Sequence, residues 1–170
     1  MRTHAARTHT VIDSPMGALT LVATDGTLSG VYMEDHLHMP DPSTFGPRVN
    51  SGFEEAARQL GEYFAGERKD FTLRTRLAGS DFQRRVWQTV TAIPYGQTWT
   101  YARVADAVGR RDRIRAVGAA NGRNPIAVVV PCHRVVGSDG SLTGYAGGLA
   151  RKKFLLDLER SAGPRPGQLF

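Results

Sequence analysis

The spacing of apolar residues predicts a small sheet and one helix in the first part of the chain. Short runs rich in apolar and β-branched residues alternate with turn signals, and these runs lie at 10–13, 18–23 and 28–33. Residues 36–50 are rich in Pro and Asp, which favours a loop. From 53 to 65 the apolar residues then recur at helical spacing. We therefore expect three short strands followed by a helix.

The second part of the chain predicts a succession of helices. Ser80 and Gln83 have the spacing of a capping box, so a helix should begin directly after Ser80. Thr100 is expected to cap a short helix that stops at Gly109, and Asp112 is expected to cap the next one. The three predicted helices cover 81–93, 101–108 and 113–121. Two short helices joined by a glycine-containing turn indicate a helix-turn-helix, a pattern that many other helix pairs share.

Three further elements are predicted toward the end of the chain and in the linker. Residues 71–73 have the pattern of a short strand, and the uninterrupted apolar run 126–130 is typical of a buried strand. An amphipathic helix should cover 149–158. Among the apolar residues we expect Ile114 and Leu149 to face inward. The residues expected on the outer face of the last helix are Arg151, Lys152 and Lys153.

Together these elements predict an α+β fold in two domains. Residues 1–75 would form a supporting domain, a small N-terminal antiparallel sheet with a helix. Residues 76–162 would form a mostly helical C-terminal domain that contains the helix-turn-helix and the candidate active site. Residues 163–170, with their Gly and Pro, predict a loose tail.

The distribution of charge changes this picture more than the composition does. The hydrophobic fraction of 41% and the charged fraction of 22% are ordinary for a globular protein. Residues 81–153, however, carry 12 basic and 4 acidic side chains, a net charge of +8, whereas residues 1–80 carry a net charge of −2. Such asymmetry favours a polyanionic partner such as nucleic acid. Arginine selected merely for solubility is the alternative.

The cysteine and histidine content limits the classes of site. One cysteine excludes a disulfide framework and a four-cysteine zinc site, and it suits a reducing compartment. The first ten residues lack the apolar core of a signal peptide, and no run approaches the roughly 18 apolar residues of a membrane span. We therefore predict a cytoplasmic protein that does not bind membranes. His36 and His38 could recruit a metal, but without a third ligand nearby we predict an exposed pair and no metal site.

The only cysteine lies in the hexapeptide Val-Pro-Cys-His-Arg-Val, residues 130–135. Cys132 could be a nucleophile, because a neighbouring base or cation increases the thiolate fraction of a thiol. It could equally be inert core filling, since free cysteines are among the most buried residues. The flanking proline, histidine and arginine favour the nucleophile.

Five motifs in order along the chain resemble one family, the O6-alkylguanine-DNA alkyltransferases, also called methylated-DNA–protein-cysteine methyltransferases. They are Pro-Cys-His-Arg-Val at 131–135 and the motifs at 93–96, 115–118, 121–125 and 142–148. The resemblance runs from about Ser80 to Glu159. Before that, only residues 13–17 fit, and loosely.

The resemblance implies a single-turnover DNA repair protein that flips O6-alkylguanine out of the duplex and transfers the alkyl group irreversibly to Cys132. By this resemblance His133 takes the thiol proton through a bound water, and Glu159 orients its imidazole. Because adjacent residues of a regular strand point to opposite faces, His133 reaches Cys132 only if the chain bends or water intervenes. Tyr101 would crowd the adjacent phosphate and protonate the leaving guanine.

The resemblance also implies how DNA is held. Arg115 would fill the vacated base stack, while Ala116 and Ala119 allow close approach to the minor groove of double-stranded DNA, and Arg123 is a further DNA contact. Asn124 would be a hinge between the recognition helix and the cysteine segment. The expected guanine pocket consists of Val135, Tyr145, Ala146, Gly147 and Gly148. We expect a monomer in solution and leave cooperative binding along DNA open.

Two departures from the family pattern matter, and three alternatives stay open. Some members carry a serine at the position of Ala146, and some bind zinc through N-terminal cysteines that this chain lacks, so neither contact is expected here. No cofactor is implied, because the lesion itself donates the alkyl group. The first alternative is an alkyltransferase-like protein that binds lesions without transfer. The others are a Cys-His hydrolase and a sequence-specific helix-turn-helix regulator.

Overall fold

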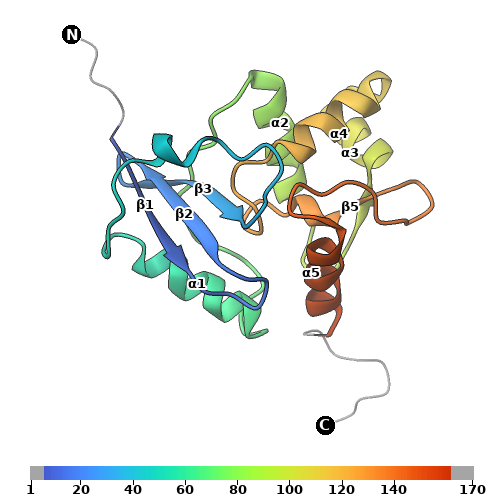
Figure 1. Ribbon diagram of the computed structural model, residues 1–170. Coiled ribbons are helices and arrows are strands. Elements are labelled where there is room, and N and C mark those ends of the chain that lie inside the picture. The colour runs from blue at the N-terminus through green and yellow to red at the C-terminus, as the bar shows by residue number, and fades with distance from the viewer. Residues whose placement is uncertain (1–5, 162–170) are drawn as a thin grey trace.

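A three-stranded antiparallel sheet opens the fold, in a computed structural model that describes residues 6–161. The strands, in spatial order, are β1 (Arg7–Ile12), β2 (Leu19–Thr24) and β3 (Thr27–Met33). Helix α1 (Glu54–Phe64) runs along one face of this sheet, as Figure 1 shows. The predicted sheet and helix are confirmed, within one to three residues at each end.

The alternation of side chains along β2 explains how the sheet is covered on both faces. Leu19 and Leu21 are fully buried in the main core, which α1 joins with Leu60. Val22 points to the opposite face, where it packs with Tyr32 and Phe45. That face is covered by η1 (Pro42–Phe45), a short 3₁₀ helix inside the segment that the sequence predicts as a loop.

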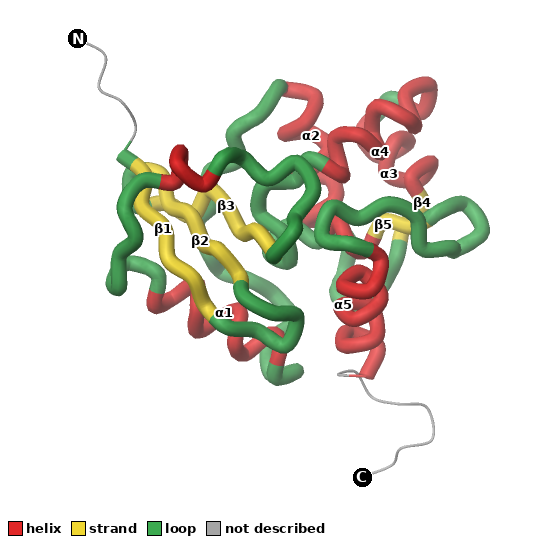
Figure 2. Tube along the Cα trace, in the orientation of Figure 1, coloured by secondary structure: helices red, strands yellow, loops and turns green. Residues whose placement is uncertain are grey.

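The predicted helix-turn-helix is present beside the sheet. Its two helices are α3 (Tyr101–Val108) and α4 (Ile114–Gly122), with the 3₁₀ helix η2 (Arg111–Arg113) between them, and α2 (Asp81–Thr91) precedes them. Ser80 makes the predicted capping box with Gln83, and the Thr100 hydroxyl caps α3. Gly109 ends α3 in the left-handed conformation, at φ +83, which favours glycine. Figure 2 shows α2, α3 and α4 gathered on one side of the molecule, and the sheet with α1 on the other.

The candidate active-site segment follows α4. It consists of η3 (Cys132–Arg134), β5 (Val135–Val136) and α5 (Leu149–Ser161), and β5 pairs in parallel with β4 (Trp99–Thr100). One continuous core joins the sheet, α1, α2, α3 and α5. The fold is therefore α+β, as predicted. The division at residue 75 stays a prediction, and the predicted tail at 163–170 lies outside the described residues.

The predicted strand at 126–130 is wrong. These residues are almost all buried, but the chain turns within them: Val129 N donates to Ala127 O at 2.8 Å and Val130 N to Ile126 O at 2.9 Å. Val128 has φ +72, in the left-handed region. An apolar run reports burial, and it does not distinguish a strand from a buried turn.

Smaller errors have local causes. Residues 71–73 form no strand, and only a single bridge joins this linker to β3, at Thr75. Asp112 does not cap α4, because its carboxylate pairs with Arg110 and η2 intervenes. Ile114 and Leu149 are exposed, since each stands at the first turn of its helix. None of the described helices is long and apolar enough to cross a membrane.

Candidate active site

The cysteine lies on a 3₁₀ turn, not at the end of a strand. Cys132 N donates to Val130 O at 2.8 Å, and Arg134 N donates to Pro131 O at 2.9 Å. Cys132 is only 6% exposed, and both His133 and Arg134 are buried. The chain therefore bends here, which was one of the two alternatives left open by the sequence, but no direct hydrogen bond joins His133 to Cys132 among the described residues.

Two asparagines tie this turn to α4. Asn124 Nδ2 donates to Cys132 Sγ at 3.1 Å and to Val130 O at 2.8 Å, while its Oδ1 accepts from Ile126 N at 3.0 Å. Asn121 Nδ2 donates to Cys132 O at 3.2 Å. The position of the thiol thus depends directly on the end of α4. Asn121 lies in a motif of the sequence but was not among the predicted site residues.

The residue after the cysteine, a buried histidine, is paired with a buried carboxylate. His133 Nε2 lies 2.7 Å from Glu159 Oε2. Burial lowers the pKa of His133, and although Glu159 opposes this shift, the imidazole is neutral at pH 7. Because an ionised carboxylate only accepts, Nε2 carries the proton and donates it to Glu159. Nδ1 is then a free acceptor, and it has no hydrogen-bond partner in the described structure.

Glu159 is held ionised by an unusual number of donors. Arg134 donates to both carboxylate oxygens, at 2.8 and 3.0 Å, Tyr63 donates at 2.6 Å, and Gly96 N donates at 3.2 Å. Burial alone raises the pKa of this carboxyl, but the hydrogen bonds from His133 and Arg134 outweigh it and lower the pKa to about 2. The carboxylate therefore keeps one imidazole orientation across the physiological range.

A cavity of about 300 Å³ lies next to the cysteine turn: Asn121, one of its lining residues, donates to Cys132 O, whereas Cys132 itself is not part of the lining. Six of its lining residues are Tyr101, Ala119, Asn121, Arg123, Tyr145 and Ala146. Tyr101 donates its hydroxyl to Thr143 O at 3.0 Å, and burial raises its pKa, so it stays a neutral phenol. Burial also raises the pKa of Cys132, while Asn124, Lys152 and Tyr145 lower it. The free protein therefore holds a thiol that needs a base.

Two family models match consecutive parts of the chain, with only a few residues between the two matches. The first, 6-O-methylguanine DNA methyltransferase, ribonuclease-like domain, matches residues 8–77. The second, 6-O-methylguanine DNA methyltransferase, DNA binding domain, matches residues 81–161. The chain belongs to the 6-O-methylguanine DNA methyltransferase family. The family predicted from the motifs is confirmed, and the match extends through the first part of the chain.

Relatives within this methyltransferase family match over nearly their whole length. The methylated-DNA–protein-cysteine methyltransferase of Mycolicibacterium paratuberculosis is 50% identical, over 94% of this chain and 96% of the relative. The constitutive enzyme of that name from Bacillus subtilis is 40% identical, over 89% and 94%. The crystal structure of Mycobacterium tuberculosis OGT in complex with DNA superposes with a TM-score of 0.84 at 46% identity, covering 92% of this chain and 95% of that one.

The remaining residues that the methyltransferase motifs suggested lie in three places. Arg115 is exposed at the start of α4, next to the partly exposed Ala116, and neither Arg115 nor Arg123 has a side-chain partner among residues 6–161. Gly147 is buried against Met33, where a Cβ would overlap the sulfur. Gly148 is exposed at φ +91 and does not line the cavity.

Lys152 is a site residue of this methyltransferase that the sequence analysis placed on the wrong face. The expected outward lysine is fully buried, and its Nζ donates to Val135 O at 2.6 Å, Thr143 O at 2.8 Å and Gly144 O at 3.2 Å. Burial lowers its pKa to about 8, and the ammonium in turn lowers the pKa of Cys132. No sequence motif marks this lysine site, because it is formed by three backbone carbonyls that only the fold brings together.

The histidine pair is also arranged differently from the prediction. His36 is buried, and its Nδ1 accepts a hydrogen bond from Met33 N at 3.1 Å. His38 is exposed, as predicted. Within residues 6–161 no three His, Cys, Asp or Glu side chains gather as metal ligands would.

Proposed function

We propose that this protein repairs O6-alkylguanine in double-stranded DNA by moving the alkyl group irreversibly onto Cys132. The observation that carries the proposal is a set of three buried groups next to the cavity: the Cys132 thiol, the His133 imidazole and the Glu159 carboxylate. Cys132 is a thiol there, His133 is neutral with a free Nδ1, and Glu159 fixes the imidazole. The names of the relatives support the same reaction.

The proposed step balances without a cofactor. The Cys132 proton passes through one water to His133 Nδ1, and the thiolate attacks the alkyl carbon in line with the departing oxygen. A carbon–sulfur bond forms as the carbon–O6 bond breaks, and the electron pair stays on guanine. Guanine then gains one proton, for which the neutral Tyr101 hydroxyl is our candidate donor; the phenolate regains a proton from water, and the His133 imidazolium releases one. The thioether is stable, so each molecule acts once.

DNA is the proposed partner, and α4 is the proposed contact. The Mycobacterium tuberculosis relative was crystallised with DNA. Here Arg115 is exposed where it could fill a vacated base stack, and the small residues Ala116 and Ala119 permit close approach of the helix to a minor groove. Binding as a monomer and a cytoplasmic location are part of this proposal.

A duplex that contains one O6-methylguanine tests the proposal. After incubation, intact-mass and peptide analysis should find one methyl group in place of one hydrogen, on the peptide that contains Cys132, with one lesion repaired per protein. Cys132→Ser should gain no mass and should keep its affinity for the duplex. An unmodified Cys132 after tight lesion binding would favour the lesion-binding alternative. Repeated turnover on an ester would favour a hydrolase.

A further inference from the structure

The segment after β3, residues 34–40, reaches from the sheet to the proposed guanine pocket. Leu37 N donates to Ala146 O at 2.7 Å, and both Leu37 and His38 line the same cavity as Tyr101 and Tyr145. Figure 1 shows this segment beside the loop that precedes α5. The first part of the chain therefore supplies one wall of the pocket, a role that no sequence motif indicates.

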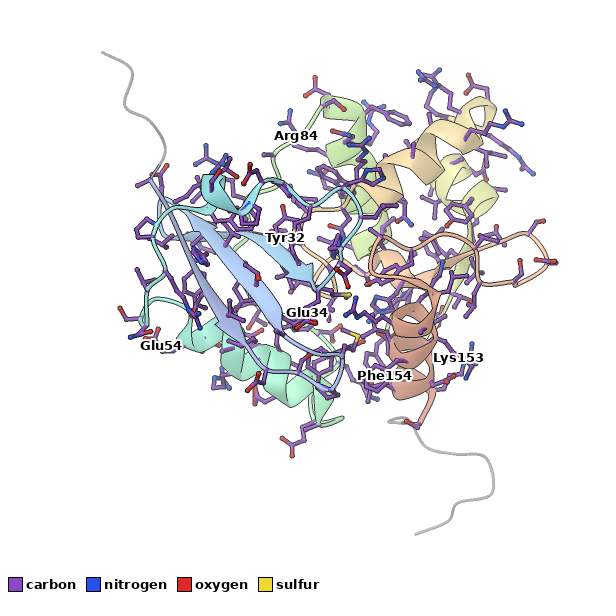
Figure 3. All side chains as sticks on the ribbon, viewed as in Figure 1. Tyr32, Glu34, Glu54, Arg84, Lys153 and Phe154 are labelled. Carbon is purple, nitrogen blue, oxygen red and sulfur yellow. The ribbon has the colours of Figure 1, made fainter. Side chains whose placement is uncertain are left out.

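This wall is fixed at its base. Arg151 Nη1 donates to Glu34 O at 2.6 Å and to Gly147 O at 3.2 Å, and so joins the end of β3 to the pocket loop. Figure 3 shows Glu34 at this junction. His36 packs edge-on against Tyr32, with ring centroids 5.4 Å apart. Burial lowers the pKa of His36 to about 4, so this support carries no charge at neutral pH.

The tip of the wall has a different character from its base. Leu37 is 61% exposed, more than Ile114 and Leu149, the other exposed large apolar residues within 6–161. His38 follows with φ +62, a left-handed conformation that costs free energy in a residue other than glycine. A rigid base that holds an apolar side chain at the edge of a largely apolar cavity indicates contact with an apolar part of a ligand.

We propose that Leu37 forms the alkyl-side wall of the pocket and determines how well O6-alkyl groups larger than methyl are accepted. This inference rests on the proposed function. In an in-line displacement the sulfur, the carbon and O6 lie on one axis, so any substituent on that carbon projects sideways. Tyr101, Ala119 and Ala146 line the cavity together with Leu37, whose amide donates to Ala146 O. A benzyl group extends much farther from that carbon than a methyl group does, so it is the group that we expect to contact Leu37.

The test compares single-turnover rates on duplexes that contain O6-methylguanine or O6-benzylguanine. Leu37→Ala should lower the benzyl-to-methyl rate ratio roughly tenfold, the selectivity expected from loss of an apolar contact. Its methyl rate should fall less than its benzyl rate, because the smaller substituent makes less contact with the wall. Leu37→Met should preserve the ratio. Leu149→Ala is the matched control, because Leu149 is 48% exposed but lies outside the cavity.

The outcomes separate the two proposals. Transfer of methyl by the wild-type protein with an unchanged ratio in Leu37→Ala would overturn the wall and leave the proposed function standing. An equal fall of both rates in Leu37→Ala would also overturn it, because that result indicates a structural role. Failure of the wild-type protein to take up either group would reject the proposed function itself.

Discussion

At the scale of single residues, the least expected feature is a lysine buried within electrostatic reach of the nucleophile. Lys152 places its ammonium among three carbonyl oxygens of the pocket segment. Its desolvation disfavours the charged form, which lowers its pKa to about 8, yet its charge favours the thiolate of Cys132. The same side chain therefore orders the pocket loop and adjusts the acidity of the thiol.

Replacing Lys152 with methionine should raise the pKa of Cys132, because the cation that favours the thiolate is lost. The midpoint of the pH profile of Cys132 alkylation by iodoacetamide should move to higher pH. A midpoint higher by about one pH unit would leave about tenfold less thiolate at neutral pH. Lys153→Met is the control, since Lys153 is exposed and pairs with Asp157. An unchanged profile in Lys152→Met would mean that this ammonium has only a structural role.

At the scale of elements, Glu159 joins four parts of the fold. It lies on α5 and accepts hydrogen bonds from Tyr63 on α1, from Arg134 and His133 on η3, and from Gly96 before β4. Removing one partner of a buried ion pair leaves the other charge uncompensated. The arrangement that orients the base is therefore also a main connection between the two halves of the chain.

Glu159→Gln should lower the free energy of unfolding by about 3–5 kcal/mol at pH 7, because Arg134 is left buried without a counter-charge. The pKa of Glu159 falls from 4.5 to about 2 on folding, so its stabilisation is complete above pH 4.5 and is lost as the pH falls toward 2. The difference between wild type and variant, measured by urea unfolding, should therefore shrink over that interval. Asp157→Asn, an exposed change on the same helix, should cost less than about 1 kcal/mol. A difference independent of pH would contradict this explanation.

Elements with a local cause could be predicted from the sequence, and those fixed by distant contacts could not. The helices after Ser80 and Thr100 begin as predicted, because a side-chain oxygen caps each within three residues. The run 126–130 forms a turn, since contacts with β3 and Asn124 decide its path. The burial of Lys152 could not be predicted either, because it depends on carbonyls that the fold brings to its ammonium. Most of the candidate site residues could be predicted because they lie in the five motifs, whereas Leu37 lies in none of them and was missed.

At the scale of the whole molecule, the two halves of the chain share one hydrophobic core but carry opposite net charges. One core runs through both halves, so the sheet supports the site directly. The positive charge, by contrast, is concentrated after residue 80, and exposed arginines gather around the start of α4: Arg111, Arg113 and Arg115. The molecule thus presents one basic face beside the cavity while the first half stays slightly acidic.

This distribution predicts that α4 and η2 carry the salt dependence of DNA binding. The logarithm of the affinity for an undamaged duplex should fall linearly with the logarithm of salt concentration, and each lost phosphate contact should reduce the slope by about 0.9. The double variant Arg111→Gln, Arg113→Gln should therefore have a slope shallower by up to about 2, measured by fluorescence anisotropy.

The control is the double variant Arg58→Gln, Arg68→Gln, which removes the same charge from the first half, where both residues pair with Glu62. This control should keep the wild-type slope, because these residues belong to the acidic half. Equal loss of slope in both double variants would show that total charge, and not this face, governs binding.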